Sequence, residues 1–251
     1  MSGEIIKTKG IVLTIHPCSR TSHVVSWLTP DHGVVSTLVK GAVRSKSAFL
    51  GQYDFFYSCD LLYYAHASGE LHALREVKPL LTHDELRGHW RETSLAGYAA
   101  SLIRDLTPPG EESKKWYDYF EQFLATLLEK DSIPSEPPAD SRLLRKLIAL
   151  EMAILQLAGL APDFSEIDSS ADWTPFAIDR GRCGNGTRTV RITPQTVIAL
   201  TRPDARTTPD EAIADGLRFL SVFIAYHLDT FPEVRRTLVK LLAEQPGNTL
   251  P

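Results

Sequence analysis

The chain has 251 residues, of which 43% are hydrophobic and 23% are charged, and its formal net charge is -4. This is the composition of an ordinary globular protein, so it excludes an intrinsically disordered chain. No uncharged apolar run approaches the ~18 residues of a membrane-spanning helix, and residues 1–4 open no signal peptide, so we expect a cytoplasmic protein. Three widely spaced cysteines fit reduced thiols better than disulfide bonds.

Residues 4–80 contain runs rich in β-branched and aromatic residues, separated by turn signals such as Pro30 and Gly33. We expect strands at 5–13, 24–28, 34–39, 55–64 and 71–78. Short strands in this number and length predict a small closed barrel, and the five-stranded oligonucleotide-binding (OB) barrel is the best candidate.

From residue 82 the hydrophobic period becomes that of a helix. Thr82 and Glu85 have the spacing of a capping box, so a first helix is expected from 82 to about 106. Further helices are expected at 114–129, 140–157, after Pro194, after Pro209, and at 234–242. The helix at 140–157 carries two apolar rows and is expected to form the buried centre of a bundle.

Residues 163–192 differ from the helical segments around them, because they carry two β-type runs joined by an Asn185-Gly186 turn. The predicted fold class is therefore α+β. A five-stranded barrel domain at 1–80 precedes an all-α domain at 81–251, and residues 163–192 form a small hairpin insertion in the helical domain.

Positive charge is concentrated near the N-terminus, where residues 1–50 carry six Lys or Arg side chains against two acidic ones. Three of these cations follow the end of a predicted strand, in a segment with no acidic residue before Asp54. Lys and Arg side chains neutralise phosphates and release condensed counterions, whereas the alternative for such a loop is a solvated turn. The predicted DNA-binding residues are Lys7, Lys9, Arg20, Lys40, Arg44 and Lys46.

Aromatic side chains beside this charge are candidates for stacking on bases, although an aromatic residue in a strand more often belongs to the core. The nearby candidates are Trp27, Phe49, Tyr53 and Tyr57, of which we expect at most one or two to be exposed.

Catalytic and metal-binding motifs are missing from the sequence. It contains no His-Glu-x-x-His, no Gly-x-Ser-x-Gly and no Gly-x-x-x-x-Gly-Lys pattern. We therefore expect neither an enzyme nor a cofactor.

Two groups of cations occur in the predicted helical domain. Beside an apolar groove they would suit a peptide tail with acidic and aromatic residues, and the alternative is that they satisfy helix-terminal carbonyl groups. The predicted partner-binding residues are Arg142, Arg145, Lys146, Arg235 and Arg236.

Several segments, taken in order, resemble one known family. They lie at 8–13, 28–33, 40–47, 157–162, 226–228 and 235–236, and they include Lys40-Gly41-Ala42 and Tyr226-His227-Leu228. In this order and spacing they resemble the DNA repair protein RecO family of bacterial recombination mediators, over nearly the whole chain.

The resemblance implies an N-terminal OB barrel, a helical body and a zinc module. It also implies binding to single- and double-stranded DNA and annealing of complementary strands. The implied partners are the RecR protein and the C-terminal tail of single-stranded DNA-binding protein, with which such proteins load the RecA recombinase. The expected function is that of a recombination mediator in DNA repair. The alternative is a non-catalytic protein–protein adaptor of the same fold with little DNA affinity of its own.

The expected zinc module departs from the family pattern. A structural zinc site needs about four ligands, commonly two Cys-x-x-Cys pairs. Here residues 163–192 offer Cys183 alone, with Asp163, Glu166 and Asp168 near the place of the first pair. We therefore expect no metal, and a hairpin held by packing.

Overall fold

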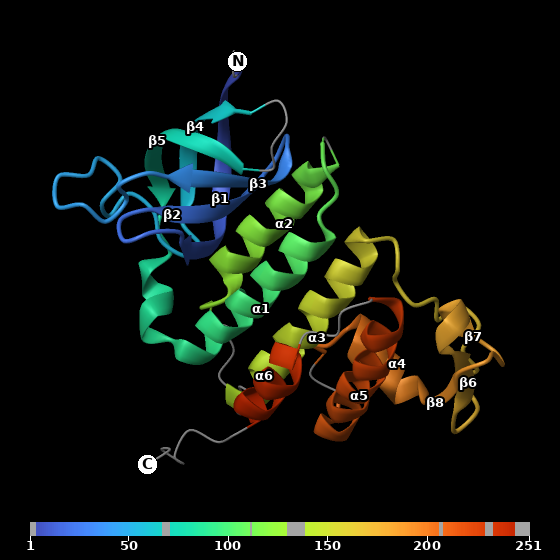
Figure 1. Cartoon of the computed structure of the whole chain (residues 1–251). Coiled ribbons are helices and arrows are strands. Elements are labelled where there is room, and N and C mark those ends of the chain that lie inside the picture. The colour runs from blue at the N-terminus through green and yellow to red at the C-terminus, as the bar shows by residue number, and fades with distance from the viewer. Residues whose placement is uncertain are drawn as a thin grey trace. The chain divides into compact units, whose positions relative to one another are not determined.

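The structure is a computed structural model that describes residues 4–66, 71–110, 112–129, 139–205, 208–228 and 233–243 (Figure 1). The chain forms two compact units, Met1–Lys130 and Asp131–Pro251. Among the described residues no helix is long and apolar enough to cross a membrane.

The first unit begins with a barrel of five strands in the order β1-β2-β3-β5-β4. The first part of β1, up to Ile11, pairs with β4, and the second part, from Ile11 on, pairs with β2. The pairing with β2 has a register shift between Val12 and Thr14. Neighbouring strands are antiparallel except β3 and β5, which are parallel. The five predicted strands are confirmed: they are β1 (Glu4–Pro17), β2 (His23–Thr29), β3 (Gly33–Val39), β4 (Ser58–Ala65) and β5 (Leu71–Leu81).

The interior of the barrel is built around Trp27, which is completely buried and donates its indole N–H to Thr37 Oγ1 at 2.9 Å. Gly10 on β1 leaves room for this packing. A Cβ atom there would lie 2.5 Å from Leu61 Cδ1 and 3.1 Å from Trp27 Cβ. The glycine of the Lys-Gly pair in β1 is therefore required by the core of the barrel.

Helices follow the barrel within the same unit: the 3-10 helix η1 (Asp84–Gly88), α1 (Trp90–Leu106) and α2 (Ser113–Thr126). The prediction that an α-helix begins at Thr82 is wrong for its first turns, because the α-helix α1 begins only at Trp90. His83 has a left-handed φ of 49°, and no side chain caps η1, so the capping box does not form.

The helices α1 and α2 are fixed against the barrel, where α1 contacts β1 and α2 contacts β2. The hydroxyl group of Ser113 accepts from Gly33 N at 3.1 Å, and Tyr117 Oη lies 3.1 Å from Ser58 Oγ. Gly33 has a φ of +70°, and a Cβ there would lie 2.9 Å from the carbonyl oxygen of Pro108. The compact units accordingly divide after residue 130, whereas the predicted domain division at 80 follows the change from strands to helices.

The second unit is a helical bundle with a small sheet. Its helix α3 contacts α4, α5 and α6 and buries Leu143, Leu147, Leu150 and Ile154, which confirms the predicted central helix. The insertion is a three-stranded antiparallel sheet in the order β7-β6-β8, and the predicted hairpin is its β6–β8 pair. The elements are α3 (Ala139–Leu157), β6 (Thr174–Ala177), the 3-10 helix η2 (Ile178–Arg180), β7 (Arg182–Cys183), β8 (Thr189–Ile192), α4 (Pro194–Thr201), α5 (Asp210–His227) and α6 (Glu233–Ala243).

Candidate nucleic-acid interface

Two loops at one end of the barrel lie side by side: residues 18–22 between β1 and β2, and residues 40–57 between β3 and β4. They are joined by two hydrogen bonds, in which Gly41 N donates to Ser22 Oγ at 3.3 Å and Val43 N donates to Thr21 O at 3.4 Å. The loops carry four of the six predicted DNA-binding side chains, all exposed: Arg20, Lys40, Arg44 and Lys46.

The longer loop, called the basic loop (residues 40–57), is a series of tight turns. Arg44 N donates to Gly41 O at 3.1 Å, Ser47 N to Arg44 O at 2.9 Å, and Leu50 N to Ser47 O at 3.3 Å. Gly41 has a left-handed φ of +71°, and the Arg44 side chain folds back over it, with Cδ 3.3 Å from the place of a Cβ. Glycine at this position therefore lets the chain turn and Arg44 lie close to the backbone.

Tyr53 anchors the C-terminal part of the basic loop on the barrel. Its Oη lies 2.9 Å from His23 Nδ1, and its ring packs edge-on against Trp27 with 6.0 Å between the ring centroids. Burial raises the pKa of Tyr53 to about 12, so the phenol stays neutral. This side chain holds the loop in place and is not free to stack on a base.

The other predicted stacking residues also pack in the core or against it. Trp27 and Tyr57 are buried, and Phe49 is half-buried against the barrel interior. The exposed aromatic residue of the loop is Phe55, at 48% exposure. The sequence placed Phe55 in a strand, but β4 begins only at Ser58. No residue pattern in the sequence showed that the strand starts at Ser58 and not at Phe55.

A charged cluster holds the C-terminal end of the basic loop. Arg87 of η1 lies 2.5 Å from Asp54 Oδ2 and 3.1 Å from Asp84 Oδ1. Tyr57 Oη donates to Asp84 Oδ1 at 2.8 Å, and this bond lowers the pKa of Asp84. Sequence reasoning missed Arg87, because its partner Asp54 lies in a different element.

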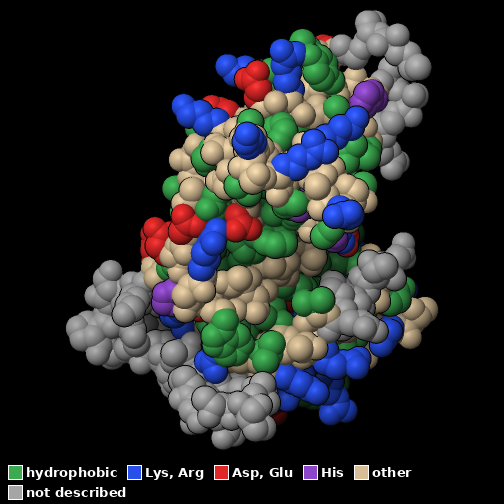
Figure 2. Space-filling view, turned by 60° about the vertical axis from the view of Figure 1, so that its left-hand side comes forward, with side chains coloured by type: hydrophobic (Ala, Val, Ile, Leu, Met, Phe, Trp, Pro, Cys, Tyr) green, Lys and Arg blue, Asp and Glu red, His purple; other side chains and the backbone are tan. Residues whose placement is uncertain are grey.

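Lys7 and Lys9 are exposed on the outer face of β1, in a different part of the barrel. Lys9 is paired across the strands with Asp60, which is in turn paired with Lys78. Lys7 and Lys9 therefore lie outside the two loops. Figure 2 shows Lys and Arg side chains over the upper part of the face in view, with Asp and Glu side chains among them.

In the second unit, Arg145 is predicted to bind a partner, but the structure buries it. Its guanidinium is buried and donates to Ser141 Oγ at 3.1 Å, to Pro203 O at 2.7 Å and to Thr208 O at 2.9 Å. It therefore joins α3 to the segment before α5, because the backbone carbonyl groups of that segment accept hydrogen bonds from this side chain.

Arg235, also among the predicted partner-binding residues, is likewise buried. Its Nη2 donates to Glu151 Oε2 at 2.8 Å, its Nε lies 2.5 Å from Glu151 Oε1, and it also bonds Ser221. Of the other predicted partner-binding residues, Arg236 is exposed, whereas Arg142 and Lys146 are half-buried on α3. Contact of these three with a partner stays a prediction.

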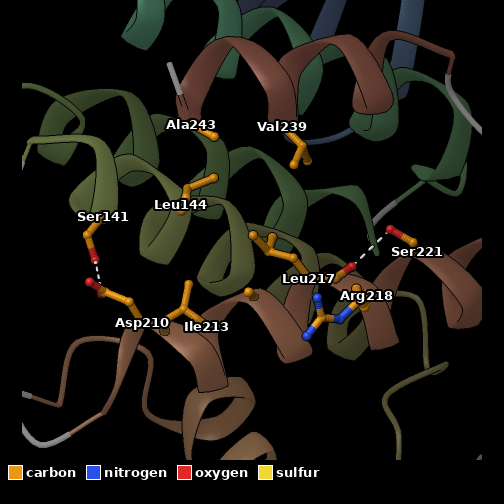
Figure 3. A pocket seen from close by; sticks show the side chains of 10 residues that line it. Ser141, Leu144, Asp210, Ile213, Leu217, Arg218, Ser221, Val239 and Ala243 are labelled. Carbon is orange, nitrogen blue, oxygen red and sulfur yellow. Dashed lines mark hydrogen bonds between the residues drawn. The ribbon is translucent and has the colours of Figure 1, made fainter. Parts of the chain in front are cut away.

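A pocket of about 460 Å³ lies between α3, α5 and α6 (Figure 3). Its lining is mostly apolar and includes Leu144, Ile213, Leu217 and Val239. Its charged residues are Asp210 and the exposed Arg218, which is also paired with Asp215. Sequence reasoning missed Arg218, although it lies on the helix expected after Pro209.

Comparison with known proteins agrees with this organisation. A family model described as "Recombination protein O N terminal" matches residues 1–82, and one described as "Recombination protein O C terminal" matches residues 87–236. The first match contains the barrel and both cationic loops.

Several relatives named "DNA repair protein RecO" are similar to the chain. The protein of Anaeromyxobacter dehalogenans (strain 2CP-C) is 27% identical over 252 residues, which cover 93% of this chain and 95% of the relative. That of Anaeromyxobacter sp. (strain K) is 30% identical over 157 residues, covering 62% and 58%. That of Bacillus subtilis (strain 168) is 25% identical over 162 residues, covering 64% and 58%. The last two alignments therefore span less than two thirds of those relatives.

Proposed function

Because the chain belongs to the RecO family of DNA repair proteins, we propose that it is a recombination mediator that binds single- and double-stranded DNA without catalysis. The observation that supports this most is the group of four exposed cations on two hydrogen-bonded loops. Between residues 40 and 53 the sequence contains no carboxylate that would compete with phosphate for them. Phosphate binding of this kind is independent of base sequence.

The strand order supports an OB-type barrel. In this order, a barrel of five strands closes through the parallel pair β3–β5, and OB barrels commonly bind oligonucleotides. We place DNA across the two cationic loops, where Phe55 is the exposed aromatic residue able to stack on a base. Neutralising the phosphates of two strands at this surface would favour their annealing, because it lowers the repulsion between them.

The proposed partners follow from the family resemblance: the RecR protein, the tail of single-stranded DNA-binding protein, and RecA as the recombinase that is loaded. We assign no residues of this chain to RecR or RecA. For the peptide tail we propose the pocket between α3, α5 and α6, because its apolar lining suits an aromatic side chain and Arg218 suits a carboxylate. This assignment replaces the buried Arg145 and Arg235 of the sequence-based prediction.

The second candidate function is that of a protein–protein adaptor with little DNA affinity, which the net charge of -4 favours. Titration of labelled single- and double-stranded oligonucleotides at two salt concentrations separates the two functions. The mediator binds both, and more weakly at high salt. An adaptor shows no binding at low salt, while still binding the acidic peptide.

A further inference from the structure

The sheet formed by β6, β7 and β8 occupies the place where the family resemblance implies zinc, and its residues do not fit that metal. Among the described residues, no group of three or more His, Cys, Asp or Glu side chains is arranged to hold a metal ion. The nearby carboxylates are engaged locally, since Asp163 Oδ1 accepts from Ser165 N at 2.9 Å and Asp168 Oδ1 accepts from Ser170 N at 2.9 Å. Cys183 is left as one thiol without the soft ligands that a structural zinc site requires.

Asp179 closes the turn of this sheet. Its Oδ2 accepts from Thr187 N at 3.1 Å and its Oδ1 accepts from Arg188 N at 3.3 Å. The backbone is also paired here, with Ile178 N donating to Arg188 O at 2.8 Å. Two backbone donors on one carboxylate stabilise its ionised form, which agrees with the lowered pKa of Asp179. The side chain therefore joins the end of β6 to the segment that leads into β8.

Gly186 lets the turn lie directly on this carboxylate. A Cβ at residue 186 would collide with Asp179 Oδ1 and would lie 2.7 Å from Ala177 Cβ. Any larger residue would have to displace the carboxylate or the strand. The turn therefore needs both Asp179 and a residue without a side chain at position 186.

The inner face of the sheet has an aromatic core of its own. Phe176 of β6 is completely buried, and its ring centroid lies 5.5 Å from that of Phe164, 5.1 Å from Phe219 and 6.2 Å from Phe223. Phe219 and Phe223 belong to α5, so the cluster fixes the sheet to the bundle. Small modules need a metal when they cannot bury enough apolar surface, and this one buries it against α5.

We propose that the Asp179 carboxylate and the phenylalanine cluster close the 163–192 module in place of a metal ion, so that the module folds without zinc. This inference concerns the second unit alone and does not depend on DNA binding.

Wild-type protein tests the proposal directly. We expect protein purified without added zinc to contain well under one zinc ion per chain, and amide exchange protection in residues 174–192 to be the same with and without a chelator. Stoichiometric zinc that survives dialysis, or loss of protection on adding the chelator, would overturn the proposal.

A pair of variants tests the role of the carboxylate. In Asp179→Asn the new amide group presents a donor where two backbone donors must be accepted, so protection in residues 174–192 should fall. Asp168→Asn is the matched control, because that carboxylate bonds only within its own turn and its loss should leave residues 174–192 protected. Equal protection in the two variants would contradict the assignment to Asp179. If Asp179→Asn does not fold, the wild-type metal content and chelator response still decide the metal question.

Discussion

The guanidinium of Arg87 lies 2.5 Å from the carboxylate of Asp54 and thereby connects η1 to the C-terminal end of the basic loop. Tyr53, next to Asp54, strengthens this anchor through its bond to His23, and the other end of the loop is held by the bond from Gly41 N to Ser22 Oγ. A loop held at both ends presents its cations in a restricted set of positions, which lowers the entropy lost on binding a phosphate chain.

Replacing Arg87 tests whether this anchoring matters for DNA binding. We expect Arg87→Ala to reduce oligonucleotide affinity a few-fold through greater freedom of the loop, with an unchanged salt dependence because no phosphate contact is lost. The control is Arg104→Ala, which removes an exposed α1 cation paired with Asp105 and should leave affinity unchanged. A smaller salt slope in Arg87→Ala would show instead that Arg87 contacts DNA itself.

The stability of the first unit is expected to fall in mild acid because of His83. Its Nε2 is buried without a hydrogen-bond partner among the described residues, and burial lowers its pKa. Above the unfolded-state pKa of ~6.5 both states are neutral, whereas below it the unfolded state takes up the proton more readily, so stability decreases as the pH falls.

The matching variant is His83→Asn, since asparagine tolerates the left-handed backbone and does not titrate. Its loss of melting temperature between about pH 7 and pH 5 should be smaller than that of the wild type. His16→Asn, at an exposed site on β1, is the control and should change nothing. An equal acid response in His83→Asn and the wild type would exclude His83 as the cause.

The buried pair of Arg235 and Glu151 should be structural. Removing one partner of such a pair leaves an uncompensated charge, so Arg235→Ala should lower the free energy of unfolding by about 3–5 kcal/mol. The exposed neighbour supplies the control, and Arg236→Ala should change it within about 0.5 kcal/mol. Urea unfolding measures both. Equal small effects would mean that Arg235 is solvated, contrary to its burial here.

Peptide binding distinguishes the pocket from the cation clusters predicted from the sequence. Arg218→Ala should weaken binding of a peptide with a C-terminal acidic and aromatic tail, because Arg218 is the cation of the pocket. Arg236→Ala, on the neighbouring helix, should leave it unchanged. Fluorescence anisotropy of the labelled peptide measures both, and the opposite order of effects would move the site to the exposed face of α6.

The sequence predicted the elements well where local patterns decide them. The five strands follow from β-branched runs between turn residues, and the burial of α3 follows from its apolar rows. The first turns of the helix after Thr82 were wrong, because a capping-box spacing cannot reveal that His83 takes a left-handed conformation.

The cations were predictable as residues but only partly as a site. Arg20 lies beside the basic loop because its neighbours Thr21 and Ser22 accept bonds from that loop, which no local pattern encodes. Lys9 is paired across the sheet with Asp60. The burial of Arg145 and Arg235 could not be predicted from helical periodicity, because their partners come from distant segments of the chain. Long-range pairing of polar groups therefore limited the prediction.

If the basic loop neutralises DNA phosphates, as we propose, the salt dependence of binding measures this directly. In the variant with Lys40, Arg44 and Lys46 all replaced by alanine, the slope of log affinity against log salt should fall by about 2 units on single strands, at ~0.7 per phosphate contact. The control variant replaces the exposed Arg104, Lys114 and Lys115 of α1 and α2, which gives the same change in net charge. A melting curve for each variant confirms that it is folded. We expect the reduced slope in the loop variant alone, and an unchanged slope in the folded loop variant would show that these three cations do not contact phosphates.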